Sequence, residues 1–142
     1  MTRYVVGFAF TPDRRHVLLI CKSRPDWQRG RYNGIGGKVE PNEDPVTAMR
    51  REFQEETSVP LLNWREVGVY FGTDPVGEFY IEVFAGTIEV YPNLNWVRDE
   101  QISWWPVDSL PATSLDSIKW LVPMASLPTG RFSVEEHKCT RS

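Results

Sequence analysis

Two short apolar segments near the start of the chain predict a pair of strands. Residues 4–10 (YVVGFAF) are rich in β-branched and aromatic residues, and residues 16–21 (HVLLIC) form a second apolar run. The sequence between them begins TPD, which is typical of a turn. We therefore expect a β-hairpin over residues 4–21.

A helical pattern follows, and its ends are marked by the residues that flank it. Asp44 is a suitable N-cap residue, and Pro45 is tolerated at the first helical position because its missing N–H would have no partner there. Pro60 prevents the helix from extending much further. The sequence predicts a helix from Pro45 to about Thr57.

This helix has an apolar side and a crowded acidic side. Three apolar residues spaced i, i+3 and i+7 form the core-facing side: Val46, Met49 and Phe53. At 100° per residue, Glu52, Glu55 and Glu56 fall within an arc of about 100° that borders this apolar stripe. We expect the three carboxylates to lie at the edge of the packed face, where a cleft can form.

The rest of the pattern predicts three more strands and a second helix. The strands are expected over residues 64–71, 78–90 and 102–107, and the helix over residues 114–127, with Pro123 distorting or ending it. Residues 22–32 are a polar, basic loop. The order predicts an α/β fold in which a mixed sheet lies between helices, an α/β/α sandwich.

Composition and charge narrow the class of protein. The chain has 142 residues, 41% of them hydrophobic and 25% charged, which suits one globular domain over residues 1–142. The last dozen residues are polar, and we expect them to be loosely held. The net charge of −3 argues against a protein that binds a nucleic-acid polymer.

The lack of a recognisable targeting signal and the arrangement of the cysteines suggest a cytoplasmic protein. No apolar run approaches the roughly 20 residues that cross a bilayer, and the N-terminal apolar stretch is too short for a signal peptide. Cys21 and Cys139 are far apart and form neither a disulfide framework nor a zinc motif. The sequence gives no signal of whether the protein is a monomer or an oligomer.

The three glutamates have two explanations. Like charges at i, i+3 and i+4 destabilise a helix, so the arrangement is either an ordinary solvated face or a site for a cation. Mg²⁺ prefers a few carboxylates, water and substrate phosphates. Gly36 and Gly37 precede the helix, and glycines allow the backbone to approach a ligand and offer a carbonyl. This combination favours a site for a metal and a phosphate.

The spacing of these residues resembles a known family signature. From Gly37 to Val59 the chain matches the Nudix box, G-x5-E-x7-R-E-U-x-E-E-x-G-U, at every fixed position except Ser58, where the box has glycine. The box spans 23 residues, and the expected order of elements is also similar to that family. The chain is thus identified as resembling Nudix hydrolases, in particular the MutT-like enzymes that act on 8-oxo-dGTP.

The resemblance implies roles for particular residues. Glu52, Glu55 and Glu56 correspond to ligands of Mg²⁺, for which Mn²⁺ is a substitute, and the carbonyl of Gly36 or Gly37 would add to them. Two further residues correspond to the structural ion pair that holds the loop against the helix: Glu43 and Arg51.

Ser58 departs from the box, and the general base is not fixed by it. Glycine at this position supplies a positive φ at the helix C-cap, and serine adopts that conformation at a cost of about 1 kcal/mol. We expect altered capping without loss of catalysis. The base in this family is a box glutamate or a later acidic residue. Glu100 is the later candidate here, although it is equally well explained as a surface charge.

The stretch from Asn33 to Glu40 resembles the WNGxGGKxE motif of enzymes that hydrolyse oxidised purine nucleoside triphosphates. Tyr32 replaces the tryptophan of that motif. The resemblance implies that Asn33 binds the base, although asparagine is also a common turn residue. Lys38 belongs to the same motif, and Arg24 lies in the basic loop that would receive a triphosphate.

The second helix resembles the base-facing helix of the same enzymes, with different spacing. Asp116 and Trp120 are its candidate substrate residues. Trp120 would stack on a base or anchor the helix in the core, and Asp116 is equally explained as a surface residue.

Other Nudix activities stay open. A proline about 15 residues past the box marks enzymes that cleave ADP-ribose, and Pro75 is one residue away from that position, in a turn that explains it without a substrate. Some Nudix modules bind nucleotides without catalysis, but these usually lose box carboxylates, and this chain keeps all three. We therefore expect an enzyme whose substrate is a nucleotide.

Overall fold

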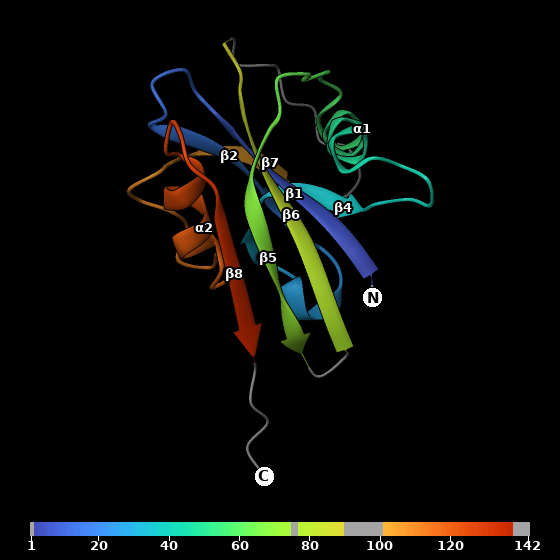
Figure 1. Ribbon diagram of the computed structural model, residues 1–142. Coiled ribbons are helices and arrows are strands. Elements are labelled where there is room, and N and C mark those ends of the chain that lie inside the picture. Colours follow the sequence, from blue (N-terminus) through green and yellow to red (C-terminus); the bar gives the residue numbers. More distant parts are fainter. Residues whose placement is uncertain (1, 75–76, 90–100, 138–142) are drawn as a thin grey trace.

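A mixed β-sheet lies between two helices, as expected for an α/β/α sandwich (Figure 1). The structure is a computed structural model and describes residues 2–74, 77–89 and 101–137. Within these residues the strands are β1 (Thr2–Phe10), β2 (His16–Cys21), β3 (Tyr32–Asn33), β4 (Ile35–Lys38), β5 (Arg65–Asp74), β6 (Gly77–Thr87), β7 (Gln101–Pro106) and β8 (Phe132–His137). The helices are α1 (Pro45–Thr57), α2 (Ile118–Ala125) and the short 3-10 helix η1 (Asp26–Gln28).

The strands form one sheet in the order β3-β2-β1-β6-β5-β8, with β4 beside β1 and β7 beside β2. The pairs β1–β6 and β5–β8 are parallel, and the other strand pairs are antiparallel. The expected hairpin is confirmed, because β1 and β2 pair antiparallel at Phe10 and Val17.

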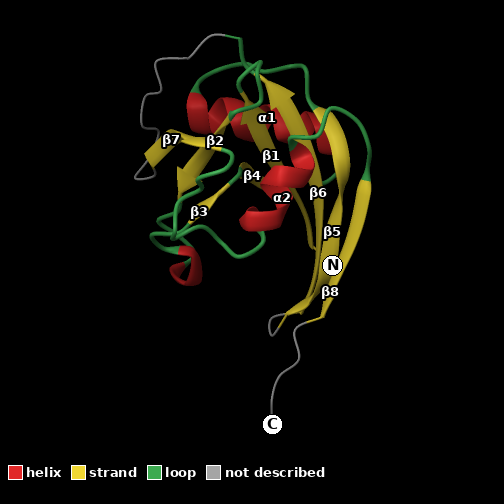
Figure 2. Cartoon of the chain, turned by 90° about the vertical axis from the view of Figure 1, so that its left-hand side faces the viewer, coloured by secondary structure: helices red, strands yellow, loops and turns green. Residues whose placement is uncertain are grey.

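Both faces of the sheet are covered, which explains the continuous apolar runs of β1 and β2. Successive side chains alternate between two hydrophobic clusters: Val6 and Phe8 pack toward α2, whereas Val5 and Ala9 pack toward α1. The views in Figures 1 and 2 place α1 and α2 on opposite faces of the sheet. Burial on both faces therefore fixes the register of the central strands.

Residues 32–38 cross from one strand to the next, which the sequence did not predict. β3 pairs with β2 and β4 pairs with β1, so the crossing occurs at Gly34, between them. A Cβ at Gly34 would lie 2.7 Å from Val6 Cγ2 and 2.8 Å from Phe8 Cε1. Only glycine fits this crossing without displacing the core beneath it.

Helix α1 has the predicted bounds, whereas α2 is shorter than predicted. Helix α2 begins at Ile118 instead of Ser114, because the segment before Ile118 pairs with a strand. The Leu115 N–H donates to the Tyr32 carbonyl over 3.0 Å, so this segment pairs with β3. Pro123 lies inside α2 and does not end it at that residue.

The expectation of a loosely held C-terminal segment is wrong for residues 132–137. These residues form β8, which pairs in parallel with β5 from Gly68 to Thr73. Phe132 and Val134 pack against the hydrophobic cluster on the α2 side. Their alternation with polar residues was a strand signal. Residues 138–142 lie outside the described residues.

No helix in the described part of the chain is long and apolar enough to span a membrane.

Ser58 adopts the left-handed conformation that glycine would supply after α1, so the expectation of altered capping is wrong. Its φ is 62° and its ψ is 16°, and its N–H donates to the Gln54 carbonyl over 2.8 Å. The serine therefore caps the helix in a conformation that favours glycine.

The variant Ser58→Gly should raise the free energy of unfolding by about 0.5–1 kcal/mol, because it removes the cost of a side chain at positive φ. Ser126→Gly is the matched control: this serine also caps a helix, but its φ is −74° and its Oγ donates to the Pro123 carbonyl over 2.7 Å. The control should lower stability. Urea denaturation measures both, and an equal loss in the two variants would contradict the capping account.

Candidate functional site

The candidate site lies where α1 packs against β4. If Gly37 carried a side chain, its Cβ would lie only 2.6 Å from the Cδ and Oε1 atoms of Glu52 and 2.7 Å from its Oε2. The Glu52 carboxylate therefore contacts the Gly37 backbone, and a side chain at this position would displace it. The local fold explains the proximity, because β4 is held on β1 by pairing of Gly36 with Val6 and of Gly37 with Val5.

Arg51 links the loop before α1 to the carboxylates on the helix. Its Nε donates to Glu43 Oε2 over 2.8 Å and its Nη2 donates to Glu43 Oε1 over 3.0 Å, a two-point contact. The same Nη2 donates to the Lys38 carbonyl over 3.0 Å at the end of β4. The expected pairing of Glu43 with Arg51 is present in the structure.

The third nitrogen of Arg51 faces the acidic side of the helix. Nη1 donates to Glu52 Oε1 over 2.8 Å and lies 3.5 Å from Glu55 Oε2. One guanidinium thus reduces the repulsion between these carboxylates, which would otherwise destabilise the helix.

These contacts shift the pKa values of both partners of the ion pair. The hydrogen bonds from Arg51 hold the pKa of the Glu43 carboxyl below its usual value, against a smaller opposing effect of burial. The hydrogen bond to Glu43 likewise raises the pKa of Arg51, with a smaller contribution from Glu52. Both groups are therefore charged at neutral pH.

The three glutamates have different surroundings. The Glu55 side chain is 45% exposed and that of Glu52 is 14% exposed, while residue Glu56 is only 6% exposed. This gradient agrees with the sequence-based expectation that the acidic arc borders the apolar stripe, of which Met49 and Phe53 are fully buried.

The donor chemistry of this cluster fits a hard divalent cation, because its side-chain ligands would all be carboxylate oxygens and the Gly37 backbone lies next to that of Glu52. In residues 2–74, 77–89 and 101–137, however, no three Asp, Glu, His or Cys side chains already converge in an arrangement that could hold a metal. Glu52 and Glu55 instead share Nη1 of Arg51.

Asn33 lies at the edge of the sheet, and its amide is oriented by its neighbours. The Gly34 N–H donates to Asn33 Oδ1 over 2.7 Å. Because a backbone N–H only donates, this contact assigns the amide oxygen, and Asn33 Nδ2 faces Gln28 Oε1 at 3.4 Å. Figure 2 shows the short helix that carries Gln28 beside β3.

Gln28 is the residue near this site that sequence reasoning missed. It lies within the basic loop, and its proximity to Asn33 depends on a turn, in which the Arg31 N–H donates to the Gln28 carbonyl over 2.8 Å. A polar residue in a polar loop gives no signal of such a contact.

The start of α2 lies next to β3, so the structure brings the segments of Asn33 and Asp116 together. Arg31 Nη2 donates to the Ser114 carbonyl over 3.3 Å and lies 3.9 Å from Asp116 Oδ1. The Asp116 side chain is 94% exposed. Its carboxylate is therefore accessible at this edge of the sheet.

Trp120 packs into the molecule. It is partly buried against the cluster on the α2 side, and its ring meets Tyr70 edge-on with centroids 5.1 Å apart. This contact favours the explanation of Trp120 as an anchor of α2, although part of its ring stays accessible.

Arg24 and Lys38 are both exposed. Lys38 is the last residue of β4, and its own carbonyl accepts the hydrogen bond from Arg51. Arg24 lies in the basic loop before η1. Glu100, the later candidate for the general base, and Pro75, the mark of ADP-ribose enzymes, lie outside the described residues.

The Glu43–Arg51 pair makes a prediction about pH. A carboxyl whose pKa is lowered by folding adds stability above its unfolded pKa of about 4.3, and this stability is lost as the pH falls through the folded pKa. Glu43→Gln should therefore unfold at lower urea concentration than the wild type at pH 7. The difference should shrink as the pH falls below about 4. A difference that does not change with pH would contradict this role.

Comparisons with known proteins agree with this geometry. The family model of the NUDIX domain matches residues 1–122. The MutT protein from Bacillus halodurans has a TM-score of 0.80 at 22% sequence identity, over 96% of this chain and 90% of that one. A MutT NUDIX hydrolase from Burkholderia pseudomallei has a TM-score of 0.72 at 21% identity, over 87% of this chain and 98% of that one.

A third similar structure contains a ligand. The NUDIX domain of NrtR from Shewanella oneidensis, solved with ADP ribose, has a TM-score of 0.70 at 18% identity, over 87% of this chain and 84% of that one. Comparison with curated protein sequences gives no match. The solved structures share the fold, and the family model covers most of the chain, including the residues from Gly37 to Val59. The chain therefore belongs to the NUDIX domain family.

Proposed function

We propose that this enzyme hydrolyses a phosphoanhydride bond of a nucleoside triphosphate, releasing the nucleoside monophosphate and pyrophosphate, with the help of Mg²⁺. The observation that carries the proposal is the contact of the Glu52 carboxylate with the Gly37 backbone, held by Arg51. This contact puts carboxylate oxygens next to the backbone of β4.

The residues that would hold the cation are Glu52, Glu55 and Glu56, together with the carbonyl of Gly36 or Gly37. Nudix hydrolases generally use divalent metal cations. When bound, such a cation neutralises charge on the diphosphate and lowers the pKa of a water molecule. Mn²⁺ has the same preference for oxygen ligands and should substitute for Mg²⁺.

The protein's own groups supply the proton transfer and the positioning. A carboxylate acts as the general base that takes the proton of the attacking water. This carboxylate belongs to a box glutamate or to Glu100. Arg51 cannot act as this base, because its guanidinium stays protonated. Its part is to hold Glu52 against Gly37 while Glu43 holds Arg51.

For the base of the substrate, we propose an oxidised purine such as that of 8-oxo-dGTP. Asn33 supports this proposal because its remaining N–H can donate to a purine edge. The pairing of Leu115 with Tyr32 brings the exposed carboxylate of Asp116 to the same edge of the sheet. Trp120 would contribute its accessible ring surface, and Arg24 and Lys38 would bind phosphates from the rim.

ADP-ribose is the second candidate substrate. The observation in its favour is the likeness to the NrtR NUDIX domain that was solved with ADP ribose. The same carboxylate cluster would serve a diphosphate in either substrate, so only the products distinguish the two.

The substrate is tested by incubation with Mg²⁺ and a panel of common nucleoside triphosphates, 8-oxo-dGTP, 2-oxo-dATP, ADP-ribose and a diadenosine polyphosphate, with products identified by mass. Fastest release of pyrophosphate and monophosphate from an oxidised purine is the expected result. AMP from ADP-ribose, with triphosphates intact, would overturn the choice of substrate and favour the second candidate.

Glu56→Gln should lower kcat by at least about 100-fold, because it removes a charged ligand without changing the size of the side chain. The control is Glu66→Gln, on β5, where the carboxylate lies 3.2 Å from Arg131 Nη2. The control should keep kcat within about twofold, as expected for a surface ion pair. Full activity in Glu56→Gln, with unchanged stability of both variants, would contradict the assignment of the metal ligands.

A further inference from the structure

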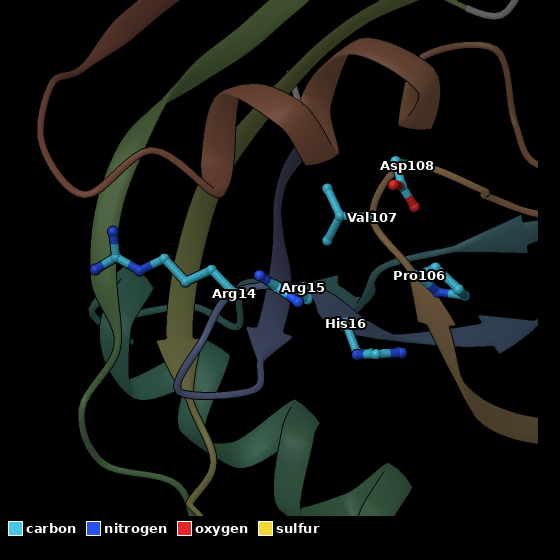
Figure 3. A pocket seen from close by; sticks show the side chains of 6 residues that line it. All are labelled: Arg14, Arg15, His16, Pro106, Val107 and Asp108. Atoms are coloured by element: carbon cyan, nitrogen blue, oxygen red, sulfur yellow. The ribbon is translucent and has the colours of Figure 1, made fainter.

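Two shallow hollows meet at the turn between β1 and β2, and Arg14 lines both. The first is lined by Arg14, Arg15, His16, Pro106, Val107 and Asp108 (Figure 3). The second is lined by Phe10, Arg14, Asn63, Arg65, Ala85, Gly86, Thr87 and Ala125.

These hollows lie at the other end of β1 from the candidate active site. Gly36 and Gly37 pair with Val6 and Val5, whereas the turn follows Phe10. Phe10 is four residue steps along the strand from Val6, which is about 13 Å at about 3.3 Å per residue. The two regions are therefore separate, and nothing in the proposed function uses the turn.

The turn presents Arg14 in a fixed position. Asp13 Oδ1 accepts hydrogen bonds from Thr11 Oγ1 over 2.7 Å and from the Arg15 N–H over 3.0 Å. The Arg14 N–H donates to the Thr11 carbonyl over 2.8 Å, and the φ of Arg14 is 60°. A side chain at this φ costs about 1 kcal/mol, so Arg14 occupies a position where the backbone conformation would favour glycine.

Arg14 points toward the second hollow. In Figure 3 its side chain extends away from Asp108 and Pro106, toward the ribbons of β5 and β6. Arg65, on β5, lines the same hollow, and its Nη2 donates to the Leu127 carbonyl over 3.1 Å, which fixes the direction of its guanidinium.

Among the described residues that line the second hollow, two side chains are positive and none is a carboxylate. Asn63 is neutral, and its amide is bonded to Thr87: it donates to the Thr87 carbonyl over 3.0 Å and accepts from the Thr87 N–H over 3.2 Å. The remaining lining residues are uncharged. In a chain with a net charge of −3, this is a local reversal of sign.

The geometry points to a second ligand site in this hollow, between Arg14 and Arg65, that binds a phosphate dianion, free or as the terminal group of a phosphate ester. Guanidinium groups bind phosphate oxygens through charge-assisted hydrogen bonds. The cavity measures about 270 Å³. This is below the usual range of about 300–1,000 Å³ for pockets that enclose a drug-sized ligand, so it suits a phosphate group better than a whole nucleotide.

Phosphate titration followed by amide NMR tests this site directly. Inorganic phosphate is added to ¹⁵N-labelled protein at constant ionic strength, with chloride as the balancing anion, and AMP is titrated separately. The expected result is a saturable shift of the Gly86 and Thr87 amides with at least one of the two probes. A response to inorganic phosphate alone indicates a free ion, and a response to AMP indicates an ester.

The matched variant is Arg14→Gly, which removes the guanidinium and suits the positive φ, so the fold should be retained. Its phosphate affinity should fall by about tenfold, the effect of losing one charge-assisted hydrogen bond. Lys119→Ala removes an equal charge from an exposed position on α2 and should bind phosphate like the wild type.

Three results would overturn the proposal. The first is the absence of saturable shifts at Gly86 and Thr87 with both probes. The second is an equal affinity for phosphate in the wild type and in Arg14→Gly. The third is a response confined to Gly36 and Gly37, which would assign phosphate binding to the candidate active site alone. The proposed hydrolase activity would be unaffected by any of these results, because it depends on other residues.

Discussion

The candidate active site depends on one guanidinium group. Arg51 grips Glu43 with two nitrogens, reaches the carbonyl of Lys38 and holds Glu52 with the third nitrogen. Each contact is ordinary by itself, but together they join the loop, the end of β4 and the acidic side of α1. Because these hydrogen bonds involve charged groups that are partly buried, they are stronger than exposed pairs. They also reduce the repulsion between Glu52 and Glu55, which would otherwise destabilise the helix.

Glycines provide the space in which this linkage works. At Gly37 the missing side chain admits the Glu52 carboxylate, and at Gly34 it lets the chain cross from the edge of β2 to the edge of β1. The same short stretch thereby completes the sheet and places its backbone beside the acidic helix. The two helices then cover opposite faces, so that the strands between them are buried on both sides.

The sequence predicted the parts of this structure that follow from local chemistry. The bounds of α1 depend on residues close in the chain, and the structure has them. The pairing of Glu43 with Arg51, which the family resemblance implied, is also present. What it did not predict depends on distant contacts. β8 is held by β5, α2 starts late because Leu115 pairs with Tyr32, and Gln28 meets Asn33 through a turn. The edge-on contact of Trp120 with Tyr70 is another such distant contact.

The most direct test of the central idea, that the carboxylates beside Gly37 hold a divalent cation, does not need a substrate. Small amounts of Mn²⁺ are added to ¹⁵N-labelled protein, and the amide signals that broaden first are assigned. The account predicts that the signals of Gly36, Gly37 and the helix from Glu52 to Glu56 broaden at the lowest ratio of Mn²⁺ to protein, and that excess Mg²⁺ restores them. Broadening that begins elsewhere, or that Mg²⁺ does not reverse, would contradict it.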